Sequence, residues 1–346
     1  MKPTHALYLL AASLLLFSCE KPGPMEEGLT GEVILSVDLG PEATKAGNYT
    51  TELASERAVQ SVEYFLFDSQ GRLEAMISTT GTSSVRTTVR TGSKTVWAVV
   101  NLPSSRFSDV KTLSQFEAKE VSFADFGASR FPMSGKKAGV SVSTGAVSVS
   151  IPVERFVSRI CVAQVTNRLN GSLSGETINI TNIFLENVVG NSRVTGTTPS
   201  SLLWYNQCGR KSTDRSKFIA SPSDADYPAF TFDGSSGATV GYGSTSDLYS
   251  CLYMFPNSAT GTACGWTGTF TPRYTRIVIE ASILGERYYY PLNLADVRRN
   301  NAYTLYLTIT HPGSRDPDTF DFVTDQDVVI TIGGFDDFDD DFVITY

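Results

Sequence analysis

The chain has 346 residues, of which 41% are hydrophobic and 18% are charged, and its formal net charge is -8 at pH 7. This length leaves room for two domains, and this composition excludes a disordered chain. Because no basic block or stripe accompanies the acidic balance, the sequence also argues against nucleic acid as a partner.

Residues 1–19 have the features of a bacterial export leader. Lys2 precedes an apolar stretch, Ala6 to Phe17, that is too short to span a membrane. The leader ends in Leu-Phe-Ser-Cys, which resembles a lipobox, so we expect Cys19 to be lipidated and to become the mature N-terminus. The alternative is a leader cleaved at a small residue, with Cys19 incidental. Residues 20–30 form a polar tether.

Residues 31–155 predict an N-terminal β-sandwich domain. Its first strand is expected at 32–39, where Val33, Leu35, Val37 and Leu39 alternate with other residues. The polar stretch 40–58 has no period and predicts an exposed loop. Further strands are expected at 59–68, 85–91 and 94–103. A short helix capped by Asp109 is expected at 109–118, and a hairpin at 140–153.

Residues 156–346 predict a second β-sandwich domain, with the boundary near 153–159. Its strands are expected at 159–166, 177–187, 249–256, 275–284, 287–294 and 302–310. The region from 187 to 247 is rich in glycine, serine and threonine and predicts loops with short strands. The predicted fold is therefore all-β, with two tandem β-sandwich domains and few short helices. Three aromatic residues in or near the loop-rich region could stack on sugars or could fill gaps beneath the loops: Trp204, Tyr205 and Trp266.

The sequence offers little for catalysis. His5 is lost with the leader, His311 is the histidine that remains, and no GxSxG, P-loop or dinucleotide motif is present. We predict that the chain is not an enzyme and binds no cofactor or metal. The aspartates between 336 and 341 could hold calcium, but they lack an EF-hand pattern, and a solvated hinge is the favoured reading. The four remaining cysteines leave three disulfide pairings open: Cys161, Cys208, Cys251 and Cys264.

The chain ends with two alternating apolar stretches. Three residues of the first share one face of a strand, and three of the second share one face of another: Val328, Ile330, Ile332 and Phe342, Ile344, Tyr346. The final stretch could complete its own sandwich or could insert into the sandwich of a neighbour. We favour insertion, with 335–346 as a donor-strand tail and its aspartates as protection against aggregation.

Several segments together resemble the fimbrillin family, the FimA-like and Mfa-like pilus subunits of Bacteroidota. The resemblance covers most of the chain after Gly31, and its most specific part is RYYYPLNLADVRRNNAYTLYLTITHPGSRDPD. Shorter matching segments are EYFLFDSQGRL, WAVVNLP, FPMSGK, VERFVSRICV and LYMFPN. In the place of the family's C-terminal tryptophan, this chain has Phe335.

The resemblance implies a transthyretin-like arrangement of strands and a role as a structural subunit of a cell-surface fimbria. It implies that a processing protease cuts the loop after the first strand, here between Lys45 and Ala46, with Arg57 as the fallback. Family members often have arginine where this chain has Lys45. The expected partners are other copies or related pilus subunits, the outer membrane through the lipid anchor, and a host or bacterial surface ligand. The alternative function is a tip or surface adhesin that binds glycan or host protein without polymerising.

Overall fold

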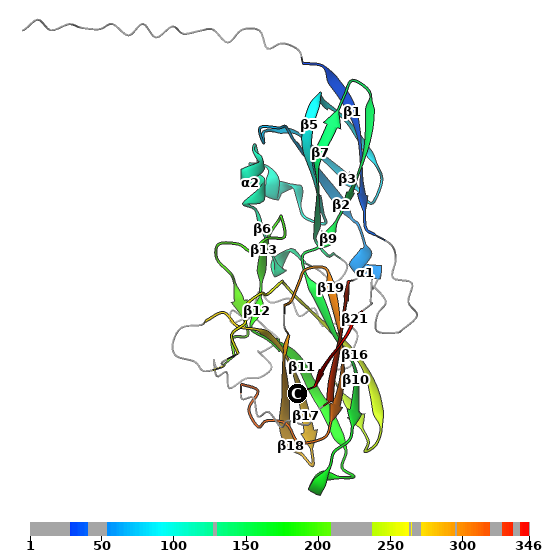
Figure 1. Ribbon diagram of the computed structural model, residues 1–346, viewed down its shortest axis with the longest axis vertical. Helices are drawn as coiled ribbons and strands as arrows, with labels where there is room; N and C mark the ends of the chain where they lie inside the picture. The colour runs from blue at the N-terminus through cyan, green and yellow to red at the C-terminus, as the bar shows by residue number, and fades with distance from the viewer. Residues whose placement is uncertain are drawn as a thin grey trace, which may run out of the picture.

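The structure is a computed structural model that describes residues 28–40, 54–126, 130–208, 237–262, 264, 271–294, 296–318, 327–334 and 340–345, the last two ranges as backbone. The molecule is elongated, and the sheets of the first half lie at one end and those of the second half at the other (Figure 1). No helix among the described residues combines the length and apolarity that crossing a membrane requires.

The first half folds into two sheets of short alternating strands. A three-stranded sheet has the order β4-β1-β8, and a five-stranded sheet has the order β3-β2-β5-β7-β9. The bounds are β1 Thr30–Asp38, β2 Ser61–Phe67, β3 Leu73–Thr80, β4 Val85–Arg90, β5 Gly92–Val100, β7 Met133–Val142, β8 Ala146–Pro152 and β9 Glu154–Arg155. The β3 strand was not expected, because its side chains are mostly half-buried and show little alternation.

The apolar faces of these two sheets enclose one core. Val33 and Leu35 of β1 pack there with side chains of β2, β5, β7 and β8, including the fully buried Val62, Tyr64 and Leu66. The predicted hairpin at 140–153 is wrong, because β7 and β8 belong to opposite sheets and do not pair with each other. Both strands instead turn alternate residues toward the shared core, which explains why their pattern resembled a hairpin.

The second half also forms two principal sheets. Their orders are β16-β10-β19-β20-β21, in which β10 and β19 are parallel, and β15-β11-β17-β18. The bounds are β10 Ser158–Asn167, β11 Ile178–Glu186, β15 Ala238–Val240, β16 Thr245–Met254, β17 Thr275–Ile283, β18 Glu286–Leu294, β19 Asn301–Ile309, β20 Asp327–Gly334 and β21 Asp340–Thr345. The prediction of an all-β fold is confirmed. The domain boundary stays a prediction.

Short elements complete the fold, and one pair of short strands joins the two halves. The strand β13 (Asn191–Arg193) pairs with β6 (Glu120–Ser122), and β12 (Val188–Val189) pairs with β14 (Trp204–Tyr205). The α-helices are α1 (Ala54–Arg57) and α2 (Leu113–Glu117), and the 3-10 helices are Ser104–Phe107, Phe123–Asp125 and Gly171–Leu173. Asp109 does not cap α2. Thr112 does, in a capping box with Gln115, while Asp109 forms an ion pair with Lys119.

Candidate functional site

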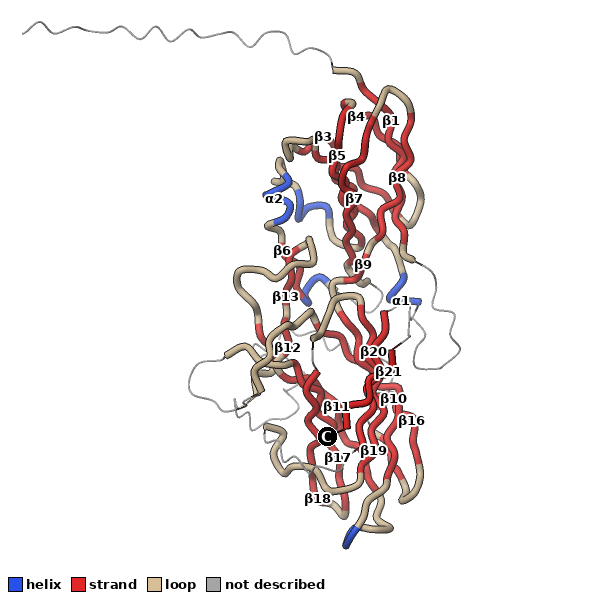
Figure 2. Tube along the Cα trace, in the orientation of Figure 1, coloured by secondary structure: helices blue, strands red, loops and turns tan. Residues whose placement is uncertain are grey.

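The strand β1 is the middle strand of the three-stranded sheet (Figure 2). It runs antiparallel to β4 from Thr30 to Leu35 and parallel to β8 from Glu32 to Asp38. If β1 left, β4 and β8 would each present an unpaired edge to the space between them. An open edge of this kind pairs readily with another strand. We call this space the β1 slot; Val33, Leu35, Val37 and Leu39 fill it.

The side chains of β1 close the core of the first half. Val33 and Leu35 are fully buried, and Val37 and Leu39 are partly buried against the same core. Burial of an aliphatic side chain contributes about 1.5–3 kcal/mol, so the two fully buried residues contribute roughly 3–6 kcal/mol. A strand that replaced β1 would have to supply apolar side chains at the same alternate positions.

Tyr64 of β2 lies in the same core as Val33 and Leu35. Its side chain is fully buried, and its hydroxyl finds no hydrogen-bond partner among the described residues. Burial raises the pKa of Tyr64 to about 12, because the charged phenolate would lose its hydration there. The titration of Tyr64 is therefore sensitive to how well the core beneath β1 is closed.

The structure describes only one of the expected processing residues, Arg57. Lys45 and Ala46 lie outside the described residues, within 41–53. Arg57, the fallback, is the last residue of α1, and its guanidinium donates a hydrogen bond of 2.5 Å to the carbonyl oxygen of Gly40. This bond joins the two ends of the expected processing loop.

A buried ion pair fixes α1 to the second half of the molecule. Glu56 is fully buried, and its carboxylate oxygens accept hydrogen bonds from Arg159 Nη1 at 2.8 and 3.0 Å and a third from the hydroxyl of Tyr253. Burial, together with the charge of Glu56, raises the pKa of Tyr253 well above its usual value. Arg155 Nε also donates to the carbonyl oxygen of Glu56 at 3.0 Å. A protease needs an extended and accessible segment, so this anchored helix is a poor place for cleavage.

The Glu56 anchor was not expected, and the predicted exposed loop at 40–58 is wrong at its C-terminal end, where residues 54–57 form α1 and Glu56 is fully buried. The segment around Glu56 is polar and shows no period, which is typical of an exposed loop. The clue lies at the partner, because Arg159 stands inside an otherwise apolar strand and a buried arginine requires a carboxylate or an equivalent acceptor.

The C-terminal strand pairs within its own molecule in this structure. The backbone of β21 is antiparallel to β20, with Phe342 opposite Ile330 and Ile344 opposite Val328. The strand β21 lies at the edge of its sheet, with β20 as its neighbour, whereas β20 lies between β19 and β21. The alternative of a self-completing last strand is thus the arrangement seen, and the donor role of β21 stays a prediction. Tyr346 and Phe335 lie outside the described residues.

Of the candidate ligand aromatics, the structure describes Trp204 and Tyr205. Trp204 and Tyr205 are both half-buried and pack against the main core, and the Tyr205 ring lies 6.0 Å from the ring of Phe123. Trp266 and most of the acidic cluster lie outside the described residues. The two described aromatics therefore contribute to the packing of the core.

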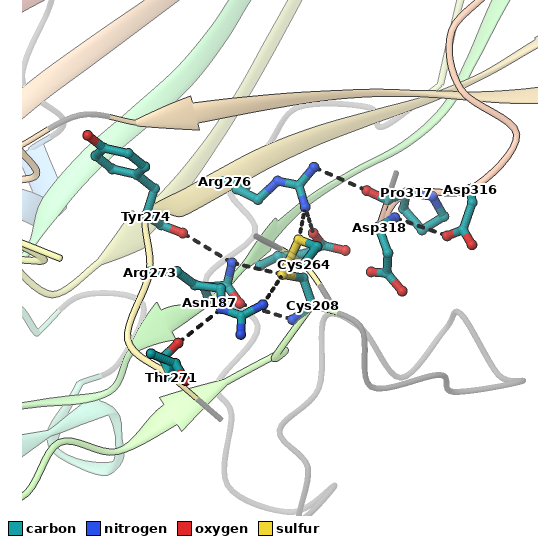
Figure 3. The surroundings of a disulfide bond; sticks show 11 residues. Asn187, Cys208, Cys264, Thr271, Arg273, Tyr274, Arg276, Asp316, Pro317 and Asp318 are labelled. Carbon is teal, nitrogen blue, oxygen red and sulfur yellow. Dashed lines mark hydrogen bonds and ion pairs between the residues drawn. A yellow bond between two sulfur atoms is a disulfide. The ribbon is translucent and has the colours of Figure 1, made fainter. Parts of the chain in front are cut away.

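The four cysteines form two disulfides, Cys161–Cys251 and Cys208–Cys264. Figure 3 shows the second bridge beside Asn187, Arg273 and Arg276. Arg276 is buried, and its Nη1 lies 3.4 Å from a carboxylate oxygen of Glu186. Glu186 and the two sulfur atoms lie close enough to suggest a metal site. Because the sulfurs are bonded to each other, they are not the thiolates that a metal would need.

His311 serves the loop in which it lies. Its Nδ1 pairs with the Thr310 hydroxyl at 2.9 Å, and its carbonyl oxygen accepts a bond from the Tyr290 hydroxyl. Neither contact supplies the serine and carboxylate pair that a hydrolytic triad requires.

Comparison with solved structures defines the class of fold. The chain superposes on a fimbrilin, FimA, from Porphyromonas gingivalis with a TM-score of 0.59 at 14% identity, covering 90% of this chain and 99% of that one. A protein with a provisional cell-adhesion name from Parabacteroides distasonis gives 0.62 at 16% identity, covering 89% and 97%. The tip fimbrial protein Mfa3 from Porphyromonas gingivalis, with a C-terminal truncation, gives 0.52 at 13%, covering 88% and 99%. At these identities the likeness concerns the fold, which is that of solved fimbrial proteins.

A comparison of the sequence with protein families gives a more specific result than the fold. Residues 32–181 match the family of the major fimbrial subunit protein (FimA). No curated protein matches the chain. This match confirms the fimbrillin resemblance that the sequence motifs indicated.

Proposed function

We propose that this chain is a structural subunit of a cell-surface fimbria that polymerises by strand exchange. Its precursor is exported as a lipoprotein anchored to the outer membrane through Cys19, and a protease then removes β1. The C-terminal strand of another copy fills the β1 slot. The observation that carries the proposal is the place of β1, whose removal opens a slot between two strand edges and down to the core.

Cleavage between Lys45 and Ala46 is the proposed maturation step. It is supported by the polar character of the loop and by the anchoring of α1, which makes Arg57 a poor substrate. After this cut, β1 is attached to the rest of the chain through noncovalent contacts alone. It can then be displaced by a strand that binds the slot more firmly.

The proposed donor is the segment from Phe342 to Tyr346. Three large apolar side chains at alternate positions contribute roughly 5–9 kcal/mol when buried, before ordering costs. Release of β21 from its own molecule breaks pairing along one edge, whereas insertion into the slot gains pairing along two. This difference favours exchange once β1 has gone.

The alternative role as a tip adhesin has weaker support. It would use exposed aromatic residues for glycan binding, yet Trp204 and Tyr205 pack against the core. A tip subunit also needs no donor strand, whereas this chain has a terminal apolar strand on a sheet edge. The proposed subunit performs no catalysis of its own; proteases act on it.

A mixing experiment with two disabled variants tests the proposal. A Lys45→Ala variant keeps its tail and its β1, and a variant that ends before Phe342 keeps the slot and has no donor. After limited trypsin treatment, each variant alone should stay monomeric, and an equimolar mixture should give one-to-one dimers in size-exclusion chromatography. N-terminal sequencing should find Ala46 in the truncated partner.

Arg57→Ala is the matched control for the protease step and should mature and polymerise like the parent chain. Dimers formed by the tail-less variant alone, or a mixture that stays monomeric after cleavage at Lys45, would overturn the strand-exchange proposal.

A further inference from the structure

One end of the β1 slot is closed to side chains. Gly31 is buried at this end, and a Cβ atom built there would lie 1.7 Å from the carbonyl oxygen of Ser143 and 2.8 Å from Cγ1 of Val142. The obstructing oxygen belongs to the backbone of the turn between β7 and β8, so it cannot swing aside as a flexible side chain could. Because these atoms do not belong to β1, the closure persists after β1 has left.

The other end of the slot is open. Val37 and Leu39 are partly exposed, and Asp38 is exposed to solvent. There, the Asp38 side chain accepts a hydrogen bond from the backbone N–H of Gly40 at 2.9 Å. The slot thus binds apolar side chains at the positions of Val33, Leu35 and Val37. Beyond Val37, at the open end, polar side chains can be solvated. At the position of Gly31 there is room only for glycine or for no residue.

From this asymmetry we infer that the donor strand enters the slot in the direction opposite to β1, with its C-terminal end at the β7–β8 turn. The inference rests on the proposed strand exchange and adds its direction and register. The donor would run parallel to β4 and antiparallel to β8, the reverse of β1. The slot would then select a strand that ends, or has glycine, two positions beyond its last large side chain.

A donor in the same direction as β1 fails in each favourable register. If Phe342 took the position of Val33, Asp340 would take that of Gly31, and its Cβ would collide with Ser143. If Gly333 took the position of Gly31 instead, Asp337 would fall at that of Leu35. With Gly334 there, Asp336 would fall at that of Val33. An unpaired carboxylate in this core would lose its hydration without compensation, which is strongly unfavourable.

A donor in the opposite direction meets none of these obstacles. Tyr346 takes the position of Val33, Ile344 that of Leu35 and Phe342 that of Val37, so no residue of the segment 342–346 falls at the position of Gly31. Asp340 then falls at the open end, where water can solvate its charge.

The other apolar stretch, residues 328–332, would also fit the slot in the direction opposite to β1. With Ile332, Ile330 and Val328 at those three positions, Gly334 coincides with Gly31. Of the two strands, β21 is the more easily released, because it lies at the sheet edge.

Cysteine pairs on the outer face of the sheet can distinguish the two directions of the donor strand. Ile34 of β1 stands opposite Ser148, and Ser36 stands opposite Ser150. In the inferred direction Thr345 occupies the place of Ile34, and in the direction of β1 it occupies that of Ser36. A full-length Lys45→Ala donor carrying Thr345→Cys is mixed with trypsin-matured, tail-less acceptor carrying Ser148→Cys or Ser150→Cys, under mild oxidation.

We expect a disulfide-linked dimer with Ser148→Cys and its loss with Ser150→Cys. Three outcomes would overturn the inferred direction but leave strand exchange supported. They are a disulfide to Ser150→Cys, equal yields of disulfide with both acceptors, and dimers that form without either disulfide. If the mixture gives no dimers, the result would contradict the proposed strand exchange and, with it, the inferred direction.

A second pair of variants tests the closed end without cysteines. Extending the C-terminus by Ser-Gly should preserve polymerisation, and extending it by Ser-Val should abolish it, because the valine falls where Ser143 closes the slot. Asp340→Gly should change nothing. Equal polymerisation with both extensions, or polymerisation gained through Asp340→Gly, would contradict the inferred direction.

Discussion

At the scale of single residues, the Tyr64 hydroxyl reports whether the core beneath β1 is closed. Its pKa is about 12 in the intact chain because burial would strip the charged phenolate of its hydration. Removal of β1 should let water reach the ring, and the pKa should fall toward its ordinary value near 10. The difference in phenolate absorbance between the parent chain and Tyr64→Phe, titrated before and after β1 is removed, measures this shift.

The same group makes stability depend on alkaline pH. The pKa of Tyr64 is higher in the folded chain than in the unfolded chain, so its neutral form contributes stability below pH 10 that is lost as the pH rises toward 12. Tyr64→Phe should lose less stability across this window in urea unfolding. Equal losses for both proteins, or an absorbance titration that does not move when β1 leaves, would contradict the account of Tyr64.

At the scale of elements, α1 should depend on the charge of Glu56. Glu56→Gln leaves the buried Arg159 without its counter-charge, which should lower the free energy of unfolding by about 3–5 kcal/mol. Trypsin should then also cut at Arg57, because α1 is no longer held. Urea unfolding and N-terminal sequencing of the digest measure the two effects.

The matched control for this prediction is Glu286→Gln, which disrupts the exposed pair with Arg315 and should change stability by at most about 1 kcal/mol. If Glu56→Gln were as mild as this control and opened no cleavage at Arg57, α1 would not be anchored as described.

Individual strands could be predicted because alternation is a local property. Val33 and Leu35 were expected to share a face, and they do. The sheet that each strand joins could not be predicted, since β7 and β8 have the pattern of a hairpin and separate into opposite sheets. The closure at Gly31 and the anchor at Glu56 were also missed, because each depends on a residue more than 100 positions away.

At the scale of the whole molecule, the all-β fold could be predicted from composition and repeated short strands. The site could be predicted only in part. The sequence indicated a removable first strand and an apolar last strand, and the structure places them in different sheets, β1 in the middle of one and β21 at the edge of another. Removal of β1 therefore leaves the pairing of β21 in its own sheet unchanged. The empty place of β1 and the donor strand can then come from different copies, as the proposed exchange requires.

The measurement that tests this account most directly is an electron cryo-microscopy map of filaments grown from the protein cleaved at Lys45. The account predicts that β1 is absent and that residues 342–346 of the adjacent subunit lie between β4 and β8. Filaments in which β1 still occupies its slot, or in which β21 remains paired with β20 of its own subunit, would contradict it.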